Sequence, residues 1–230
     1  MGLTDRQERI LAILQDRERL SVRELTDILY VSDMTVRRDL AVLQRQGFLQ
    51  RYHGGALRNS GGERMPIALR QYLNETDKKR LCRKAAAYLE NDFLVYLDSS
   101  STCLHIVSAL AGYQNIRVVT NSVSVLTALT ETTIPCIATG GELYKPDLCF
   151  VGEDAISYVG GICPDVAFFS TGGYEPDTGR ISDNDPRQNA LRRAVMKNAR
   201  KSVFLYDRSK CGVRCRYTLC TESDGDVILI

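Results

Sequence analysis

Residues 93–107 of the 230-residue chain read FLVYLDSSSTCLHIV. The apolar run FLVYL has the length and residue types of a buried strand, and it ends abruptly at Asp98. Four hydroxyl side chains follow, Ser99 to Thr102, before apolar residues return at helical spacing. A helix needs only one N-terminal capping side chain. The additional hydroxyls therefore predict a polar site where a buried strand leads into a helix.

Four further apolar runs repeat this arrangement, namely IRVVT, IPCIA, VAFFS and SVFLY, and helical segments such as PRQNALRRAVMKNA separate most of the five runs. Strands that alternate with helices predict a parallel sheet with helices on both faces. Ligands of such sheets bind beyond the carboxyl ends of the strands. Those ends are polar or glycine-rich in all five cases: Asp98, Ser99, Ser100, Ser101 and Thr102; Thr120, Asn121 and Ser122; Thr139, Gly140 and Gly141; Ser170, Thr171, Gly172 and Gly173; Asp207, Arg208, Ser209 and Lys210.

These residue types favour an anionic ligand. Free backbone N–H groups at a helix N-terminus, together with hydroxyls, bind phosphate well. We expect the hydroxyls of Ser99 to Thr102 to donate to a phosphate, with Lys210 as a counter-charge. Asp98 is expected to accept hydrogen bonds from sugar hydroxyls or loop amides instead. No GxGxxG or GxxxxGK[ST] motif is present, so a nucleotide is not favoured.

The first sixty residues differ in composition from the rest. They carry ten arginines, no lysine and eight acidic residues, which accounts for the whole net charge of +2. Capping boxes at Thr4–Gln7 and Ser21–Glu24 each predict the start of a helix, and Ser32 caps a third that Gly47 ends. FLQRYHGGAL then reads as two short strands around a glycine pair. Three helices and a hairpin indicate a winged helix-turn-helix.

The third helix has the pattern of a DNA-reading helix. Val36, Leu40 and Leu43 form its buried stripe, so the adjacent arginines face away from the core. A reading helix enters the major groove near its N-terminus, where arginine pairs with guanine. A solvated face with charge pairs four residues apart is the alternative interpretation. The expected DNA contacts are Ser32, Met34, Thr35, Arg37, Arg38 and Arg45 on the helix, and Arg51 and His53 on the wing.

Two segments of this region, SDMTVRRDL at 32–40 and RYHGGAL at 51–57, closely resemble the DeoR family of bacterial transcription regulators. The C-terminal part is similar to the family's sensor domain, with its motifs D-x-G-[ST]-T, T-N-S, G-G and D-x-[ST]-K. Matching positions are Asp98, Ser101, Thr102, Thr120, Asn121, Ser122, Gly140, Gly141, Gly152, Asp207, Ser209 and Lys210. The resemblance implies a Rossmann-like parallel-sheet domain similar to ribose phosphate isomerases, with a phosphorylated sugar as effector. Two departures stand out: Ser100 replaces the family's glycine, and the sequence ends at DVILI where the family usually continues.

The sequence thus predicts an α/β protein with three parts. Residues 1–57 are expected to form the winged helix-turn-helix, 58–75 a polar linker, and 76–230 a domain for effector sensing and oligomerisation. The predicted function is that of a DNA-binding transcriptional regulator, a repressor of a carbohydrate-metabolism operon controlled by a phosphorylated sugar. Its expected partners are double-stranded operator DNA, that effector and further copies of the same chain, because one short reading helix contacts too few base pairs for specific binding.

Other classes of site and location are disfavoured. Cys211, Cys215 and Cys220 cluster in the sequence, but their spacing matches no zinc pattern, so neither a metal nor a cofactor is expected. The N-terminus lacks a signal-peptide pattern and no apolar run is long enough to span a bilayer, which favours a cytoplasmic protein without a membrane partner.

Two other functions compete with the regulator. One is an isomerase-like enzyme that acts on a phosphosugar, with the N-terminal module as an accessory. An enzyme needs a positioned base, and the candidates Glu142, Asp183 and Asp185 are interpreted as solvent-facing loop acids. The other is a DNA-binding protein whose C-terminal part only oligomerises. The five polar strand ends disfavour it, since an oligomerisation module needs no polar crevice.

Overall fold

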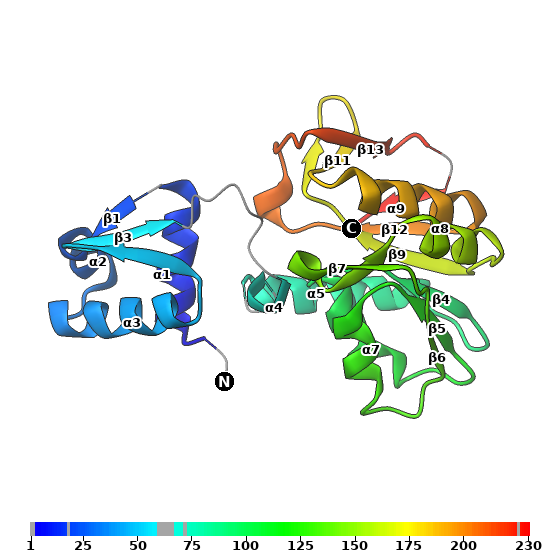
Figure 1. The fold of residues 1–230 in the computed structure, drawn as a ribbon, viewed down its shortest axis with the longest axis horizontal. Helices are drawn as coiled ribbons and strands as arrows, with labels where there is room; N and C mark the ends of the chain where they lie inside the picture. The colour runs from blue at the N-terminus through cyan, green and yellow to red at the C-terminus, as the bar shows by residue number, and fades with distance from the viewer. Residues whose placement is uncertain (1–2, 18, 59–66, 71–72, 225) are drawn as a thin grey trace. The chain divides into compact units, whose positions relative to one another are not determined.

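The computed structural model describes residues 3–17, 19–58, 67–70, 73–224 and 226–230. The chain separates into two compact units, Met1–Asn74 and Glu75–Ile230 (Figure 1). Much of the predicted linker, at 59–66 and 71–72, lies outside the described residues. Within the remainder, Ile67–Arg70 form helix α4, and Leu73 is buried with the core of the N-terminal unit.

The N-terminal unit is a winged helix-turn-helix, as predicted. Its elements are α1 (Asp5–Asp16), β1 (Arg19–Ser21), α2 (Val22–Leu29), α3 (Asp33–Arg45), β2 (Leu49–Tyr52) and β3 (Gly55–Arg58). Both predicted capping boxes are formed, and the Ser32 hydroxyl accepts a hydrogen bond from the backbone N–H of Thr35. The strands form one antiparallel sheet in the order β1-β3-β2. Strand β1 was not predicted, because three residues are too few to show an alternating pattern.

A buried carboxylate connects helix α3 to α1. The Asp39 side chain accepts hydrogen bonds from the Arg6 guanidinium and from Nε2 of Gln7, the latter at 3.2 Å. Asp39 and Gln7 are both buried, so neither side chain can turn to water if the other is lost. This contact therefore fixes the orientation of α3 within the unit.

Replacing Asp39 by alanine should lower the free energy of unfolding of the N-terminal unit by about 1–3 kcal/mol, because the Gln7 amide would stay buried without its partner. Urea unfolding followed by circular dichroism measures the loss. Asp33→Ala is the matched control, since Asp33 pairs with Arg37 on an exposed face of the same helix and such pairs contribute about 0.3–0.5 kcal/mol. Equal losses for the two variants would contradict a fastening role for Asp39.

The C-terminal unit is built on a parallel sheet in the order β14-β12-β9-β4-β5-β6. Its strands are β4 (Leu94–Leu97), β5 (Arg117–Thr120), β6 (Cys136–Ala138), β9 (Val166–Ser170), β12 (Ser202–Leu205) and β14 (Val227–Leu229). Helices α5 (Glu75–Ala85), α6 (Val107–Leu110) and α7 (Val123–Leu129) cover one face, and α8 (Glu153–Gly160) and α9 (Pro186–Asn198) the other (Figure 1). All five predicted strands are present, and the prediction of a parallel sheet covered on both faces is confirmed.

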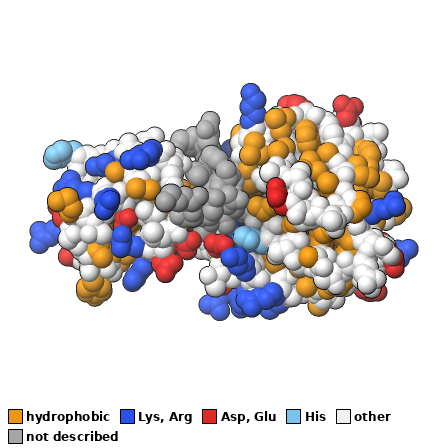
Figure 2. Space-filling view, turned by 90° about the horizontal axis from the view of Figure 1, so that it is seen from below, with side chains coloured by type: hydrophobic (Ala, Val, Ile, Leu, Met, Phe, Trp, Pro, Cys, Tyr) orange, Lys and Arg blue, Asp and Glu red, His pale blue; other side chains and the backbone are white. Residues whose placement is uncertain are grey.

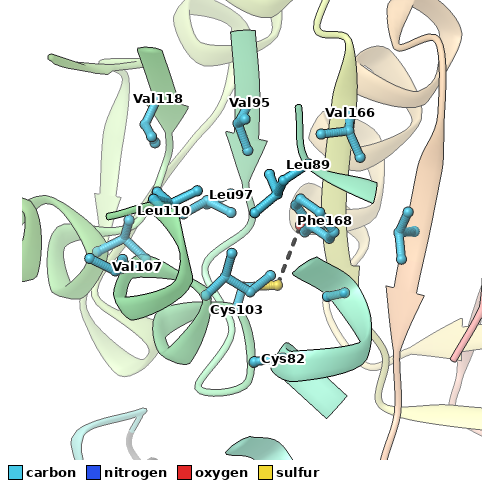
Figure 3. Packing of buried hydrophobic residues seen from close by; sticks show 14 of the residues in the cluster. Cys82, Leu89, Val95, Leu97, Cys103, Val107, Leu110, Val118, Val166 and Phe168 are labelled. Atoms are coloured by element: carbon cyan, nitrogen blue, oxygen red, sulfur yellow. Dashed lines mark hydrogen bonds between the residues drawn. The ribbon is translucent and has the colours of Figure 1, made fainter. Parts of the chain in front are cut away.

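Alternation along the strands divides the core into two layers. Val95 and Leu97 of β4 pack with α5, α6 and α7, whereas Tyr96 packs with α8 and α9. Figure 3 shows the first layer, where Cys103 lies against the sheet with its Sγ atom 3.3 Å from the carbonyl oxygen of Phe168. Burial raises the pKa of the Cys103 thiol well above its usual value, so this cysteine serves as a neutral core residue.

Several short elements were not predicted. Strands β10 (Gly173–Glu175), β11 (Arg180–Asp183) and β13 (Tyr217–Thr221) form a second, antiparallel sheet, and β7 (Glu142–Tyr144) pairs with β8 (Cys149–Val151). These strands have three to five residues each, and their mixed composition hides any period of two. The segment after β4 also differs from the predicted regular helix. It starts as a 3-10 turn, η2 (Cys103–Ile106), before α6 begins.

The strand order places a topological switch point between β4 and β9. From β4 the chain proceeds through β5 to β6 in one direction, and from β9 it proceeds through β12 to β14 in the other. Loops that leave the carboxyl ends on the two sides of such a point diverge and leave room for a ligand. In the part of the chain that the structure describes, no helix is long and apolar enough to cross a bilayer.

Candidate functional site

The loops that follow β4, β5 and β9 leave the same edge of the parallel sheet around this switch point. The Asn121 amide, after β5, donates to Ser99 Oγ at 3.4 Å, and the backbone N–H of Asp98 donates to the Phe168 carbonyl oxygen on β9 at 3.0 Å. The predicted residues of these three loops are nearly all buried. Lys210 lies in η4 (Arg208–Lys210), after β12 and two strands from β4 in the sheet. Gly140 and Gly141 follow β6 at the sheet's other side.

Asp98 has a protein partner that the sequence did not indicate. Its carboxylate accepts hydrogen bonds from Arg192 of α9, with Nη2 at 2.9 Å and Nε at 3.1 Å. The same guanidinium donates from Nη1 to Asp183 at the end of β11, at 2.8 Å. All three side chains are at most 2% exposed. Arg192 thus occupies Asp98 Oδ2, and the expected contact of Asp98 with sugar hydroxyls or loop amides stays a prediction that concerns Oδ1.

The charge on Arg192 is permanent. Burial by itself lowers the pKa of this guanidinium, but the nearby carboxylates of Asp98 and Asp183 outweigh burial and hold the pKa well above its usual value. Gln188, one turn earlier on α9, accepts a hydrogen bond from Arg192 Nη2 at 3.4 Å and donates to Asp147 at 2.7 Å. Asp147, Gln188, Arg192, Asp98 and Asp183 thus form one connected, buried polar network beneath the strand ends.

The four hydroxyls after Asp98 divide into two pairs. Ser99 Oγ donates to the Gln188 amide oxygen at 3.5 Å, and Ser100 Oγ accepts the backbone N–H of Cys103 at 2.9 Å. Ser100 is therefore the single cap that the helical segment needs. Ser101 and Thr102 are 6% and 4% exposed. No described residue forms a hydrogen bond with the hydroxyl of either one, and neither oxygen is among the fully enclosed polar atoms, so this second pair is available to a ligand.

Four other predicted site residues contribute to local structure. Thr120 Oγ1 donates to the Leu97 carbonyl oxygen at 2.6 Å, which ties β5 to β4, and Ser122 caps α7. Gly141 has a φ of 105°, and a Cβ there would lie 2.6 Å from the Val151 carbonyl oxygen. At Gly172 a Cβ would lie 2.8 Å from Cys215 Sγ. The two glycines thus allow neighbouring segments to pack closely against the loops that follow β6 and β9.

Two acids predicted to face solvent are buried instead. Asp183 is paired with Arg192, and Asp185 caps α9 by accepting the backbone N–H groups of Arg187 and Gln188. Glu142 alone of the three candidates has a mostly exposed side chain. The interpretation of Asp183 and Asp185 as loop acids was wrong, because it ignored the partners that α9 supplies.

The residues missed from the sequence are chiefly Arg192 and Gln188. A signal was present in α9, since Gln188, Leu191, Arg192 and Val195 recur at spacings of three and four and so share one helix face. Leu191 and Val195 identify that face as buried. Two polar side chains on a core-facing stripe indicate a buried network. Asp147, in the 3-10 turn η3 (Lys145–Asp147), gave no comparable signal.

The second candidate site is the outer face of α3 and the wing. Met34, Arg37, Arg38, Arg45, Arg51 and His53 are all exposed, whereas Thr35 is half-buried. Arg37 pairs with Asp33 at 2.9 Å. Within the described residues Arg38 has no ion pair, so its guanidinium is the more available of the two. Figure 2 shows several arginine side chains on the visible face of the N-terminal unit, at left.

Ser32 and Thr35 are less available than expected. Their hydroxyl oxygens lie 2.9 Å apart, and Ser32 also accepts the Thr35 backbone N–H as the cap of α3. Both side chains therefore stabilise the first turn of the helix, whatever else they contact.

Comparisons with known proteins agree with this architecture. A family model of the DeoR-like helix-turn-helix domain matches residues 6–61, and one of the DeoR C-terminal sensor domain matches residues 73–230. The chain is 29% identical over 229 residues to the glycerol-3-phosphate regulon repressor of Escherichia coli (strain K12), covering 99% of this chain and 90% of that protein. It is 32% identical over 209 residues to the L-fucose operon activator of the same strain, covering 89% and 85%.

Solved structures give more distant similarities. Ribose 5-phosphate isomerase from Plasmodium falciparum matches with a TM-score of 0.44 and 13% identity, over 66% of this chain and 55% of that one. The full-length sorbitol operon regulator SorC from Klebsiella pneumoniae matches with a TM-score of 0.36 and 10% identity, over 88% and 90%. The two sequence relatives are named as regulators, which confirms the prediction of a regulator over the isomerase-like alternative. Because the family matches extend over both units, the chain belongs to the DeoR family and is a DNA-binding transcriptional regulator.

Proposed function

We propose that this regulator is a repressor of a carbohydrate-metabolism operon and that a phosphorylated sugar or polyol, bound at the carboxyl ends of β4, β5 and β9, sets its affinity for operator DNA. One observation carries the effector proposal. Ser101 and Thr102 lie almost buried in the loop that follows β4 (residues 98–102, called the crevice loop below), and their hydroxyls have no hydrogen-bond partner among the described residues. Neither hydroxyl oxygen is among the fully enclosed polar atoms that lack a partner, so the small exposed part of each residue includes its hydroxyl. An oxygen-rich ligand is the partner that such exposed hydroxyls favour.

The relatives' names support the choice of ligand class. One relative is the repressor of a glycerol-3-phosphate regulon, and another is the activator of an L-fucose operon. Small phosphate esters of sugars and polyols are therefore the first compounds to test. Because one of the two relatives is an activator, the direction of regulation requires its own measurement.

A direct contact connects the crevice loop to α5, the first helix of the C-terminal unit. The Cys82 thiol of α5 donates to the Thr102 carbonyl oxygen at 3.3 Å, and Leu81 and Cys82 pack with Cys103 and Ile106 in one hydrophobic cluster. Helix α5 begins at Glu75, directly after the last residue of the N-terminal unit. A ligand that displaces Thr102 would thus also displace α5, the helix that directly follows the DNA-reading unit in the sequence.

The proposal is tested on the protein–DNA complex. A duplex is selected with the full-length protein from a library of random-sequence DNA, and its dissociation constant is measured by fluorescence anisotropy with and without each compound of a sugar-phosphate panel. At least one phosphorylated compound should change the constant, and its unphosphorylated parent should not. If no phosphorylated compound changes it, the proposed control by a sugar phosphate is wrong.

The reading arginines should contribute unequally to DNA affinity. Replacing Arg38 by alanine should weaken binding to the selected duplex by about 1–3 kcal/mol if it reads a base. Arg37→Ala should cost less, because Asp33 already pairs with Arg37. Lys197→Ala is the control, since Lys197 is an exposed cation on α9 of the other unit. A double Arg37→Ala, Arg38→Ala variant that binds as tightly as the unchanged protein would exclude α3 as the reading helix.

We also propose that at least two copies bind together. One reading helix spans few base pairs, whereas two copies on half-sites about one helical turn apart, or a multiple of that, give an adequate interface. Sedimentation equilibrium at micromolar concentration, with and without the duplex, should give a mass of a dimer or larger. A monomeric mass in both conditions would contradict this.

A further inference from the structure

Tyr30 has a strained backbone and an exposed side chain. It is the C-terminal cap of α2, with φ 55° and ψ 42°, in the left-handed region. Side chains other than glycine and asparagine are disfavoured there, because Cβ approaches the following carbonyl oxygen. The Tyr30 side chain is nonetheless 91% exposed. Tyrosine thus occupies a position where glycine or asparagine would make the folded state more stable.

Packing does not account for this tyrosine. The next residue, Val31, packs against the core of the N-terminal unit, whereas Tyr30 is not among the residues of that core or its margin. Neither folding preference nor burial explains a tyrosine at this position. Exposed side chains that persist on strained backbone are concentrated at functional sites.

The position of Tyr30 suggests its task. It lies two residues before Ser32, the cap of the reading helix, in the turn between α2 and α3. Met34, in the first turn of α3, is 79% exposed. Both side chains are thus exposed close in sequence to the N-terminal end of α3, the end that a helix-turn-helix presents to the major groove. A tyrosine beside that end can donate its hydroxyl proton to a phosphate oxygen.

We infer that Tyr30 is a DNA-anchoring residue whose hydroxyl donates a hydrogen bond to a backbone phosphate next to the half-site read by α3. The inference rests on the proposed reading role of α3. A phosphate contact carries no sequence information, so losing it should weaken all duplexes alike. Because the phenol is neutral, its loss should leave the slope of affinity against salt concentration unchanged.

Two substitutions separate anchoring from folding. Tyr30→Asn relieves the backbone strain, so the Tm of the N-terminal unit should be at least about 4–8 °C higher, while its affinity for the selected duplex should fall about fivefold. Tyr30→Phe keeps the ring and the strain but lacks the hydroxyl, so its Tm should be unchanged and its affinity should fall by a similar factor. Tyr217→Phe, which removes an exposed hydroxyl from the other unit, should bind normally.

The same titrations include Arg38→Ala. If Tyr30→Phe binds as tightly as the unchanged protein, or if Tyr30→Asn loses affinity only together with a lowered Tm, the anchoring inference is overturned. If Arg38→Ala is weakened while both Tyr30 variants bind normally, the inference fails and the reading role of α3 stands. If none of the variants is weakened, both fail.

Discussion

Replacing Ser101 by alanine and Thr102 by valine is expected to weaken the phosphorylated effector by tens to thousands of fold and to leave the parent sugar nearly unaffected. Each hydrogen bond from a hydroxyl to a charged phosphate contributes about 1.5–3 kcal/mol, and about 1.4 kcal/mol is tenfold in affinity. Neither hydroxyl has a hydrogen-bond partner among the described residues, so the double variant should fold normally. Isothermal titration calorimetry with both forms of the sugar measures the selectivity.

Ser100→Ala is the matched control from the same loop. The Ser100 hydroxyl caps the helical segment by accepting the Cys103 N–H, so its removal should lower the free energy of unfolding by about 1 kcal/mol. It should not reduce affinity for the phosphorylated sugar selectively. If the Ser101, Thr102 double variant loses the same factor for the phosphorylated and the plain sugar, the two hydroxyls do not recognise phosphate.

Arg192→Met is expected to lower the free energy of unfolding of the C-terminal unit by about 3–5 kcal/mol, because it leaves the buried carboxylates of Asp98 and Asp183 without their shared cation. Methionine retains much of the arginine's volume, so a cavity explains little of this loss. Chemical unfolding followed by circular dichroism gives the value.

Lys197→Met, which removes an exposed cation from the same helix, should change stability by less than about 0.5 kcal/mol. Adding Asp98→Asn and Asp183→Asn to Arg192→Met should recover part of the loss, since the buried charges are then removed together. If Arg192→Met unfolds at the same urea concentration as Lys197→Met, the network does not hold the strand ends together.

Local signals predicted most of the fold. The capping boxes at Thr4 and Ser21 and the cap at Ser32 form within four residues, so the sequence alone specifies them. The five apolar runs are buried strands of a parallel sheet, and such strands read as continuous apolar stretches. The short antiparallel strands escaped prediction because their pairing depends on partners distant in the sequence. In β11, for example, Ile181 pairs with Cys220.

The sequence predicted where the candidate site lies but not which side chains pair with one another there. Polar strand ends located the crevice, because their position in a parallel sheet follows from topology. The partner of Asp98 is Arg192, 94 residues along the chain, and no local pattern joins the two. Tyr30 shows a different limit. Glycine or asparagine at a helix end predicts a residue in the left-handed region of backbone conformation. Tyrosine gives no such prediction, so the conformation of Tyr30 could not be read from the sequence.

The measurement that tests the central claim most directly is a thermal-shift screen of the full-length protein against phosphorylated sugars and polyols, each beside its unphosphorylated parent. A ligand that binds the native state adds about 2.7 kcal/mol of stability at a hundredfold its dissociation constant. We predict that at least one phosphorylated compound raises the Tm, that its parent does not, and that the Ser101→Ala, Thr102→Val variant loses the shift. A panel in which no phosphorylated compound raises the Tm, or in which each parent raises it equally, would contradict a sugar-phosphate sensor.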